Sequence, residues 1–94
     1  MITKPIIEIQ KESVPCLQFP NEEVLTSAEA KTNRNSCLKR ATILGNIEHT
    51  KMKIIFKDSV GLKKVNTTIW AHTEKYVVLK GFKLIPLNRI LDIY

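Results

Sequence analysis

Lysines alternate with apolar residues near the middle of the chain, and this pattern is the strongest chemical signal in the sequence. In a β-strand, Lys51, Lys53 and Lys57 would share one face and the apolar residues between them the other. Lys64 and Trp70 fall on the same outward face of the next expected strand. Lysines can contact phosphates, and an exposed indole can stack on an unpaired base. The pattern predicts a surface for RNA or another single strand, since no helix carries the base-reading side chains that duplex recognition requires.

Other interpretations of the same residues remain open. Lysines also solvate strand faces and discourage aggregation at sheet edges. A bend or bulge near residue 68 would return the indole of Trp70 to the core or place it beneath a helix. A second class of function is a protein-protein interaction module that uses an N-terminal arm or a sheet edge. The pattern leaves the ligand and the oligomeric state undetermined.

The sequence contains no motif that is typical of catalysis or metal binding. The sequence has only three glycines, which excludes most of the glycine-rich loops that bind phosphates. A turn explains His72 and Glu74 better than a catalytic pair does, and a place in the core explains Cys37. Cys16 and His49 complete the possible metal ligands, but no two of these side chains have the spacing of a zinc-binding pair. We therefore expect no enzymatic activity, no metal, no cofactor and reduced thiols.

The formal net charge of +6 is divided unevenly along the 94 residues. Residues 1–36 contain four basic and five acidic side chains, whereas residues 37–94 contain eleven basic and four acidic ones. The C-terminal segment is therefore the part that can attract phosphate backbones. No stretch approaches the roughly 18 to 20 apolar residues of a membrane span, and the N-terminus lacks the apolar region of a secretion signal. These features predict a cytoplasmic protein without a membrane partner.

The sequence of the first half of the chain predicts an extended arm that is followed by a helix. Residues 1–20 contain three prolines, and we expect an extended arm that could be flexible and contributes little to stability, although residues 7–9 could add an edge strand. Residues 21–46 have a helical pattern with a break at 25–28, and Gly45 with Asn46 is a typical left-handed stop.

The second half predicts short antiparallel strands. A loop at residues 58–61 closes a hairpin whose register pairs Ile54 with Val65 and Lys53 with Asn66. Apolar residues that recur at helical spacing or on the inward strand faces form one expected core. Its members are Leu38, Ala41, Leu44, Ile54, Phe56, Val65, Ile69, Val77, Leu79, Ile85, Ile90 and Ile93.

A helix followed by four or five short strands is the layout of a small SH3-like or Sm-like antiparallel barrel. The expected fold is therefore mainly β with an N-terminal helix. We expect it to form one domain over residues 21–94. Four stretches, RATILGN at 40–46, KMKIIF at 51–56, TTIWAHTEKYVVLKG at 67–81 and LIPLNRILDI at 84–93, carry a further resemblance. They resemble small uncharacterised bacterial proteins that combine a helix with such a barrel. The resemblance covers residues 37–94 and implies a fold but no activity. The order of elements is also similar to that of Sm-like RNA-binding proteins and of the bacterial Rho-inhibitor protein, in topology only.

Overall fold

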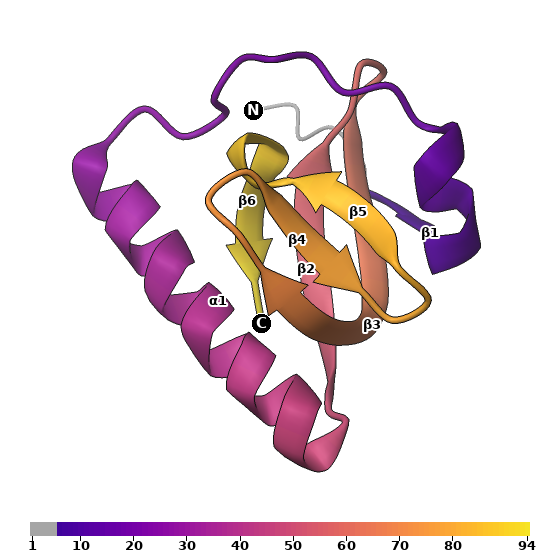
Figure 1. The fold of residues 1–94 in the computed structure, drawn as a ribbon. Coiled ribbons are helices and arrows are strands. Elements are labelled where there is room, and N and C mark those ends of the chain that lie inside the picture. Colours follow the sequence, from indigo (N-terminus) through magenta and orange to yellow (C-terminus); the bar gives the residue numbers. More distant parts are fainter. Residues whose placement is uncertain (1–5) are drawn as a thin grey trace.

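One long strand organises the fold, which is a mainly antiparallel sheet of six strands with one long helix (Figure 1). The computed structural model describes residues 6–94. Strand β3 (Leu62–His72) pairs through its first half with β2 (Lys51–Lys57) and through its second half with β4 (Tyr76–Leu79). The register between β3 and β4 shifts between Ile69 and Ala71, and such an irregularity bends a strand.

The remaining strands extend this sheet on both sides. β5 (Lys83–Pro86) pairs with β4, and β6 (Ile90–Ile93) pairs with the outer edge of β2, after the short 3-10 helix η2 (Leu87–Arg89). The strand order is β5-β4-β3-β2-β6, and within residues 6–94 no pairing closes it into a barrel. The mainly β class with one helix is confirmed, whereas closure is not.

The β2–β3 hairpin has the predicted register, because Ile54 pairs with Val65 and Lys53 with Asn66. Its turn is held by the buried side chain of Asp58, whose Oδ1 accepts hydrogen bonds from the backbone N–H groups of residues 60 and 61 at 2.8 and 2.9 Å. Burial opposes ionisation of this carboxyl, but those N–H groups and the ammonium of buried Lys63, 3.2 Å from Oδ2, hold its pKa below the ordinary value.

Helix α1 (Ala28–Glu48) begins where the Oγ of Ser27 accepts a hydrogen bond from the N–H of Ala30 at 3.0 Å. The predicted helical segment before the break, residues 21–24, is not helical. A carboxylate oxygen of Glu23 accepts a hydrogen bond from the N–H of Leu25 at 3.2 Å, and such a local contact competes with helix formation.

The predicted stop at Gly45 and Asn46 is wrong. Gly45 lies buried inside α1, where a Cβ atom would be 2.1 Å from the carbonyl oxygen of Ile69. The glycine therefore serves close packing of the helix on β3. The helix ends instead at His49, which has the left-handed φ of 56°.

The predicted core is confirmed, except that Leu44 is only half-buried. The structure adds one residue from the N-terminal arm, Val14, which is 1% exposed. Val14 lies in the 3-10 helix η1 (Lys11–Cys16), which packs against β5 and β3.

The part of the expected arm that the structure describes is ordered against the sheet. β1 (Ile7–Ile9) pairs in parallel with residues 63–65 of β3, as the sequence allowed, and the ring of Phe19 lies 5.8 Å from that of Phe56. Residues 1–5, the rest of that expectation, lie outside the described part. In Figure 1, α1 lies on one side of the sheet and η1 on the other, and the segment between them crosses at one end of the strands. Within residues 6–94, no helix has the length and apolarity that a membrane crossing needs.

Candidate functional site

The outward face of β2 carries the three predicted lysines, Lys51, Lys53 and Lys57, and all three are exposed. Lys64 lies on the same face of β3, opposite Ile55. The structure therefore places the four lysines on one surface of the hairpin, although they do not share one environment.

Acidic residues of the N-terminal third lie next to two of these lysines. The Nζ of Lys64 is 3.6 Å from an oxygen of Glu8 on β1. Lys57 lines a cavity that Glu22 and Glu23 also line. No ion pair involves Lys51, Lys53 or Lys57 within the described residues. The exposed Asp92 of β6 lies opposite Ile55 on the same outward face. Three of the four lysines therefore keep an ammonium group free of ion pairs that could attract phosphate.

Trp70 lies at the β3 irregularity, close to the position where a bend was predicted, and it is half-buried. Its ring packs edge to face on Phe82, with centroids 5.1 Å apart. Phe82 adopts a left-handed φ of 61°, which costs an L-residue about 1 to 2 kcal/mol, yet its side chain is 76% exposed. The positive φ values of Gly81 and Phe82 belong to the tight turn between β4 and β5, across which Leu79 pairs with Lys83.

Trp70 and Lys51 line one cavity of about 420 Å³, together with Lys80, between the C-terminal end of α1 and the bent half of β3. We call it the basic-aromatic cavity, and its lining residues are Gly45, Asn46, His49, Lys51, Thr68, Trp70 and Lys80. Lys80 is held there because its N–H donates to the carbonyl oxygen of Thr68 at 2.9 Å. The cavity falls within the usual range for small ligands. Two lysines and the tryptophan therefore line a single concave site.

Sequence reasoning missed Lys80 and Phe82. Neither belongs to the alternating lysine pattern, and only the pairing of β4 with the bent half of β3 brings them beside Trp70. The available signal was local: a lysine, a glycine and an aromatic residue stand in a tight reversal at 80–82.

Lys53 extends the basic surface from the cavity toward the end of β6. Its backbone N–H and C=O pair with those of Tyr94 at 2.6 and 2.9 Å, and its Nζ lies 5.9 Å from the centroid of the exposed Tyr94 ring. A second exposed aromatic side chain thus stands beside a lysine on this face.

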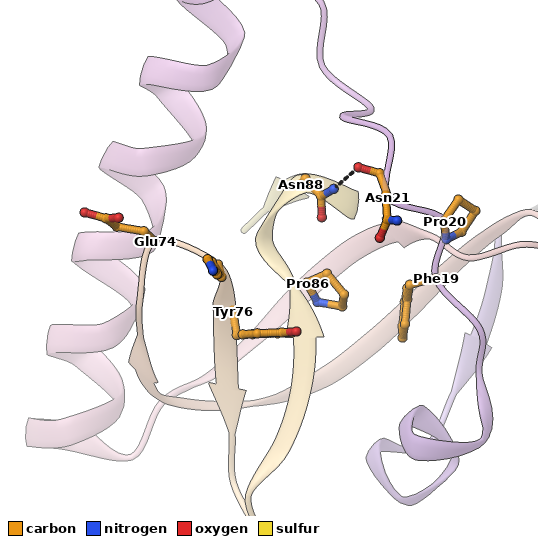
Figure 2. Close-up of a pocket in the computed structure, with 8 residues that line it drawn as sticks. Phe19, Pro20, Asn21, Glu74, Tyr76, Pro86 and Asn88 are labelled. Atoms are coloured by element: carbon orange, nitrogen blue, oxygen red, sulfur yellow. Dashed lines mark hydrogen bonds between the residues drawn. The ribbon is translucent and has the colours of Figure 1, made fainter.

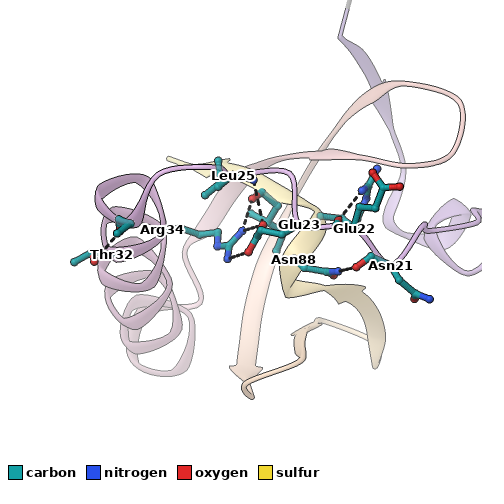
Figure 3. Close-up of polar contacts among 10 residues, drawn as sticks. Asn21, Glu22, Glu23, Leu25, Thr32, Arg34 and Asn88 are labelled. Atoms are coloured by element: carbon teal, nitrogen blue, oxygen red, sulfur yellow. Dashed lines mark hydrogen bonds and ion pairs between the residues drawn. The ribbon is translucent and has the colours of Figure 1, made fainter.

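Two arginines do not contribute to the basic surface, because both are buried structural groups. The guanidinium of Arg34 donates to both carboxylate oxygens of Glu23 at 2.8 and 2.7 Å and to the carbonyl oxygen of Ile90 at 3.1 Å (Figure 3). Its hydrogen bonds hold the pKa of Glu23 below the ordinary value. Arg89 donates to the carbonyl oxygens of Lys57 and Glu22 at 2.9 and 2.7 Å. These contacts fasten the segment before α1 to the sheet.

Another cavity, of about 360 Å³, lies beside the β3–β4 turn and has a mixed polar and apolar lining (Figure 2). Phe19, Pro20, Tyr76 and Pro86 supply its apolar walls. At the rim of this cavity, the side-chain amide of Asn88 donates a hydrogen bond to the carbonyl oxygen of residue 21 at 2.6 Å.

The segment His72–Glu74 enters a turn, as predicted. The Oγ1 of Thr73 accepts hydrogen bonds from the N–H groups of Lys75 and Tyr76 at 3.1 and 3.0 Å. The Nδ1 of His72 lies 2.8 Å from the Oγ1 of Thr42. Over residues 6–94, no three His, Cys, Asp or Glu side chains gather as a metal site would require.

Comparison of the chain with protein-family models, curated proteins and solved structures found no match. The arguments about function therefore start from the geometry of the basic-aromatic cavity and of the cavity beside the β3–β4 turn.

Proposed function

We propose that this chain is a small basic binding domain for RNA or single-stranded nucleic acid, which binds at the outer face of the β2–β3 hairpin with the basic-aromatic cavity as its centre. One observation carries the proposal: Lys51, Lys80 and Trp70 line the same cavity. Single strands are held by this combination, because every base has a π-face that can stack and every nucleotide carries a phosphate.

The exposed ring of Phe82 supports the same function. It packs edge to face on the half-buried indole of Trp70 and is itself exposed, so it offers a further aromatic surface beside the cavity. Lys53 and Tyr94 continue the surface along β2. Lys57 and Lys64 belong to the outer part of the proposed interface, where their acidic neighbours weaken attraction to phosphate.

We also propose that the fold is a relative of small SH3-like or Sm-like barrels. The supporting observation is the order of elements: a long bent second strand in the β2–β5 meander, a 3-10 turn after β5, and β6 on the outer edge of β2. This proposal concerns topology alone and assigns no role to any residue.

Fluorescence anisotropy with labelled mixed-sequence RNA and DNA single strands tests the function. We expect binding that weakens steeply with salt, and the double variant Lys51→Glu with Lys80→Glu should bind weakly to all sequences. Its plot of log affinity against log salt should be shallower by about 1.4, or about 0.7 per lost phosphate contact.

The matched control is Lys31→Glu with Lys75→Glu, which makes the same change in net charge at two exposed positions outside the cavity. This control should retain most of the affinity. Equal losses in both variants would mean that net charge alone drives binding. No salt-dependent binding of the wild-type chain would contradict the proposed function.

The second candidate function is a protein-interaction module. The exposed side chains of Tyr76 and Leu84 favour it, because they place apolar surface on the β4–β5 hairpin, beside the cavity of Figure 2. The strand β1 already pairs with β3 of its own chain, so this candidate depends on the cavity rather than on a free arm. This candidate would be supported if the chain bound no single-stranded RNA or DNA and if the substitution Tyr76→Ala weakened its binding to a protein partner.

A further inference from the structure

We propose that His49 is a third phosphate-binding group of the basic-aromatic cavity, and that it acts only when it is protonated. The chain should therefore bind a single strand more tightly as pH falls from about 8 to about 5.5. This inference rests on the proposed function, because it adds a titratable group to the same site.

His49 lies where helix α1 ends, and hydrogen bonds hold both polar groups of its backbone. The residue has the left-handed φ of 56°, and its N–H donates to the carbonyl oxygen of Leu44. Its own carbonyl oxygen accepts a hydrogen bond from the hydroxyl of Thr68 at 3.3 Å. The position of His49 relative to β3 is therefore fixed, while the residue itself is exposed to solvent.

The two lysines of the cavity lie close to His49. All three residues line the same cavity, and Lys51 follows His49 by two positions, so their Cα atoms lie within about 7 Å of each other. At about 0.1 M salt, charges in water act over about 10 Å. A phosphate held in this cavity would therefore experience a charge on His49 as well as the charges of Lys51 and Lys80.

Before a strand binds, the groups around His49 act on its charged form in opposite directions. Glu48, its exposed neighbour in α1, and the carbonyl groups at the helix C-terminus favour a protonated imidazole. Lys51 of β2 and Lys80 of the β4–β5 turn disfavour it, because like charges repel. The remaining residues of the cavity wall are uncharged. A bound phosphate offsets the charge of the lysines and favours the protonated form, and by reciprocity protonation favours the phosphate.

One additional cationic contact has a defined effect on affinity. Each phosphate contact to a single strand adds about 0.7 to the slope of log affinity against log salt, which corresponds to about fivefold in affinity at about 0.1 M salt. Imidazole changes its charge between about pH 5 and 8, whereas lysine side chains stay charged over that range. The fivefold gain should therefore appear as pH falls through this range.

The test measures the binding of the full chain to a labelled mixed-sequence RNA strand by fluorescence anisotropy, at about pH 5.5 and about pH 8.0. The strand carries no terminal phosphate, because a phosphate monoester titrates near pH 6 and would change the charge of the ligand. At about 0.1 M salt we expect about fivefold tighter binding at the lower pH, with a salt slope that is steeper by about 0.7.

Three variants assign the effect. His49→Asn removes the titratable group and suits the position, because asparagine tolerates the left-handed conformation. It should match the wild type at the higher pH and gain nothing at the lower one. His49→Arg carries a permanent charge, so at the higher pH it should bind as tightly as the wild type does at the lower one. His72→Asn is the matched control and should keep the gain, since His72 is the other histidine of the chain and does not line this cavity.

The outcomes separate the two proposals. Salt-dependent binding with equal affinity at both pH values would overturn the role of His49 and leave single-strand binding standing. A gain that His49→Asn retains would overturn it as well, and so would a His49→Arg variant that binds no more tightly than the wild type at the higher pH. No binding of the wild-type chain at either pH would remove the proposed function together with this inference. If both His49 variants fail to fold, His72→Asn still decides, because a gain lost with His72 would refute the assignment and a gain retained would support it.

Discussion

Gly45 is the position in α1 where a single added methyl group should be most harmful. A Cβ atom there would lie 2.1 Å from the backbone oxygen of Ile69 and 3.1 Å from the Cγ2 of Thr68. Alanine normally stabilises a helix interior by about 1 kcal/mol relative to glycine, but overpacking against a backbone atom costs about 1 to 3 kcal/mol and more when nothing can move. We expect Gly45→Ala to lower the free energy of unfolding, measured by urea denaturation.

The control for this prediction is Gly61→Ala in the β2–β3 turn. No heavy atom lies within 4 Å of a Cβ built on Gly61, and its backbone is outside the left-handed region. The substitution should change stability by no more than about 0.5 kcal/mol. If Gly45→Ala were as stable as Gly61→Ala, the helix would have to lie farther from β3 than the structure places it.

The short helix η1 should matter more for stability than the three prolines of residues 1–20 suggested. Val14 is fully buried against the sheet, while its neighbour Ser13 is exposed. We expect Val14→Ala to destabilise the protein by about 1 to 3 kcal/mol through the cavity it leaves, and Ser13→Ala to have almost no effect, both measured by thermal melting. Equal melting temperatures for the two variants would support the expectation from the sequence that the N-terminal arm contributes little to stability.

The strands could be predicted from sequence where local pattern and packing agree. The period-two alternation and the turn at 58–61 specify the register of the β2–β3 hairpin, because a slip of one residue would turn Ile54 and Val65 to the solvent. Residues 21–24 could not be predicted in the same way. Their helical pattern is overridden by Glu23, which binds Arg34 eleven positions away and so holds the segment in another path.

The candidate site was harder to predict than the strands. The alternation identified Lys51 and Lys53, but it grouped them with Lys57 and Lys64, whose acidic neighbours come from the N-terminal third. Gly45 followed by Asn46 is a local pattern that predicts a helix end. In the structure, Gly45 instead allows the close approach of β3 to the helix. Contacts between residues far apart in sequence assemble the cavity, and periodicity does not report such contacts.

Across the domain, the acidic and basic halves of the chain meet at one end of the hairpin. Glu8 lies beside Lys64 on paired strands, and Glu22 and Glu23 share a cavity with Lys57. Glu8 therefore offsets part of the positive charge there, and the exposed Asp92 of β6, opposite Ile55, adds a carboxylate to the outward face of the sheet. The net charge of +6 is therefore distributed unevenly over the surface.

Stability should fall in acid because two carboxylates with lowered pKa values hold separate parts of the domain. Glu23 joins the segment before α1 to Arg34, and Asp58 closes the β2–β3 turn. A carboxyl whose pKa is lower in the folded state stabilises the protein above its unfolded pKa, and the stabilisation is lost as pH falls through the folded value. We therefore expect the free energy of unfolding to decline as pH drops below about 4.5.

The variant Glu23→Gln isolates one of these contributions. At neutral pH it should be about 1 to 3 kcal/mol less stable than the wild type, because the buried guanidinium of Arg34 loses its charged partner. The difference should shrink at low pH, where Glu23 of the wild type is protonated as well. Glu22→Gln, at an exposed neighbouring side chain, is the control for urea denaturation at both pH values. A constant deficit of Glu23→Gln across the pH range would contradict the assignment.

The parallel pairing of β1 with β3 also has a kinetic consequence. Ile7 pairs with Lys63, so this contact closes a loop of 56 residues, whereas the four-residue turn at 58–61 joins β2 to β3 directly. Closing a long loop costs entropy before its contacts form, and β1 adds only three residues. We expect β1 to dock last during folding and to open first, so its amide protons should exchange with solvent at a lower opening free energy than those of β2 and β3. A native-state hydrogen-exchange series in low denaturant measures this order, and equal opening free energies for all three strands would show that the sheet opens as one unit.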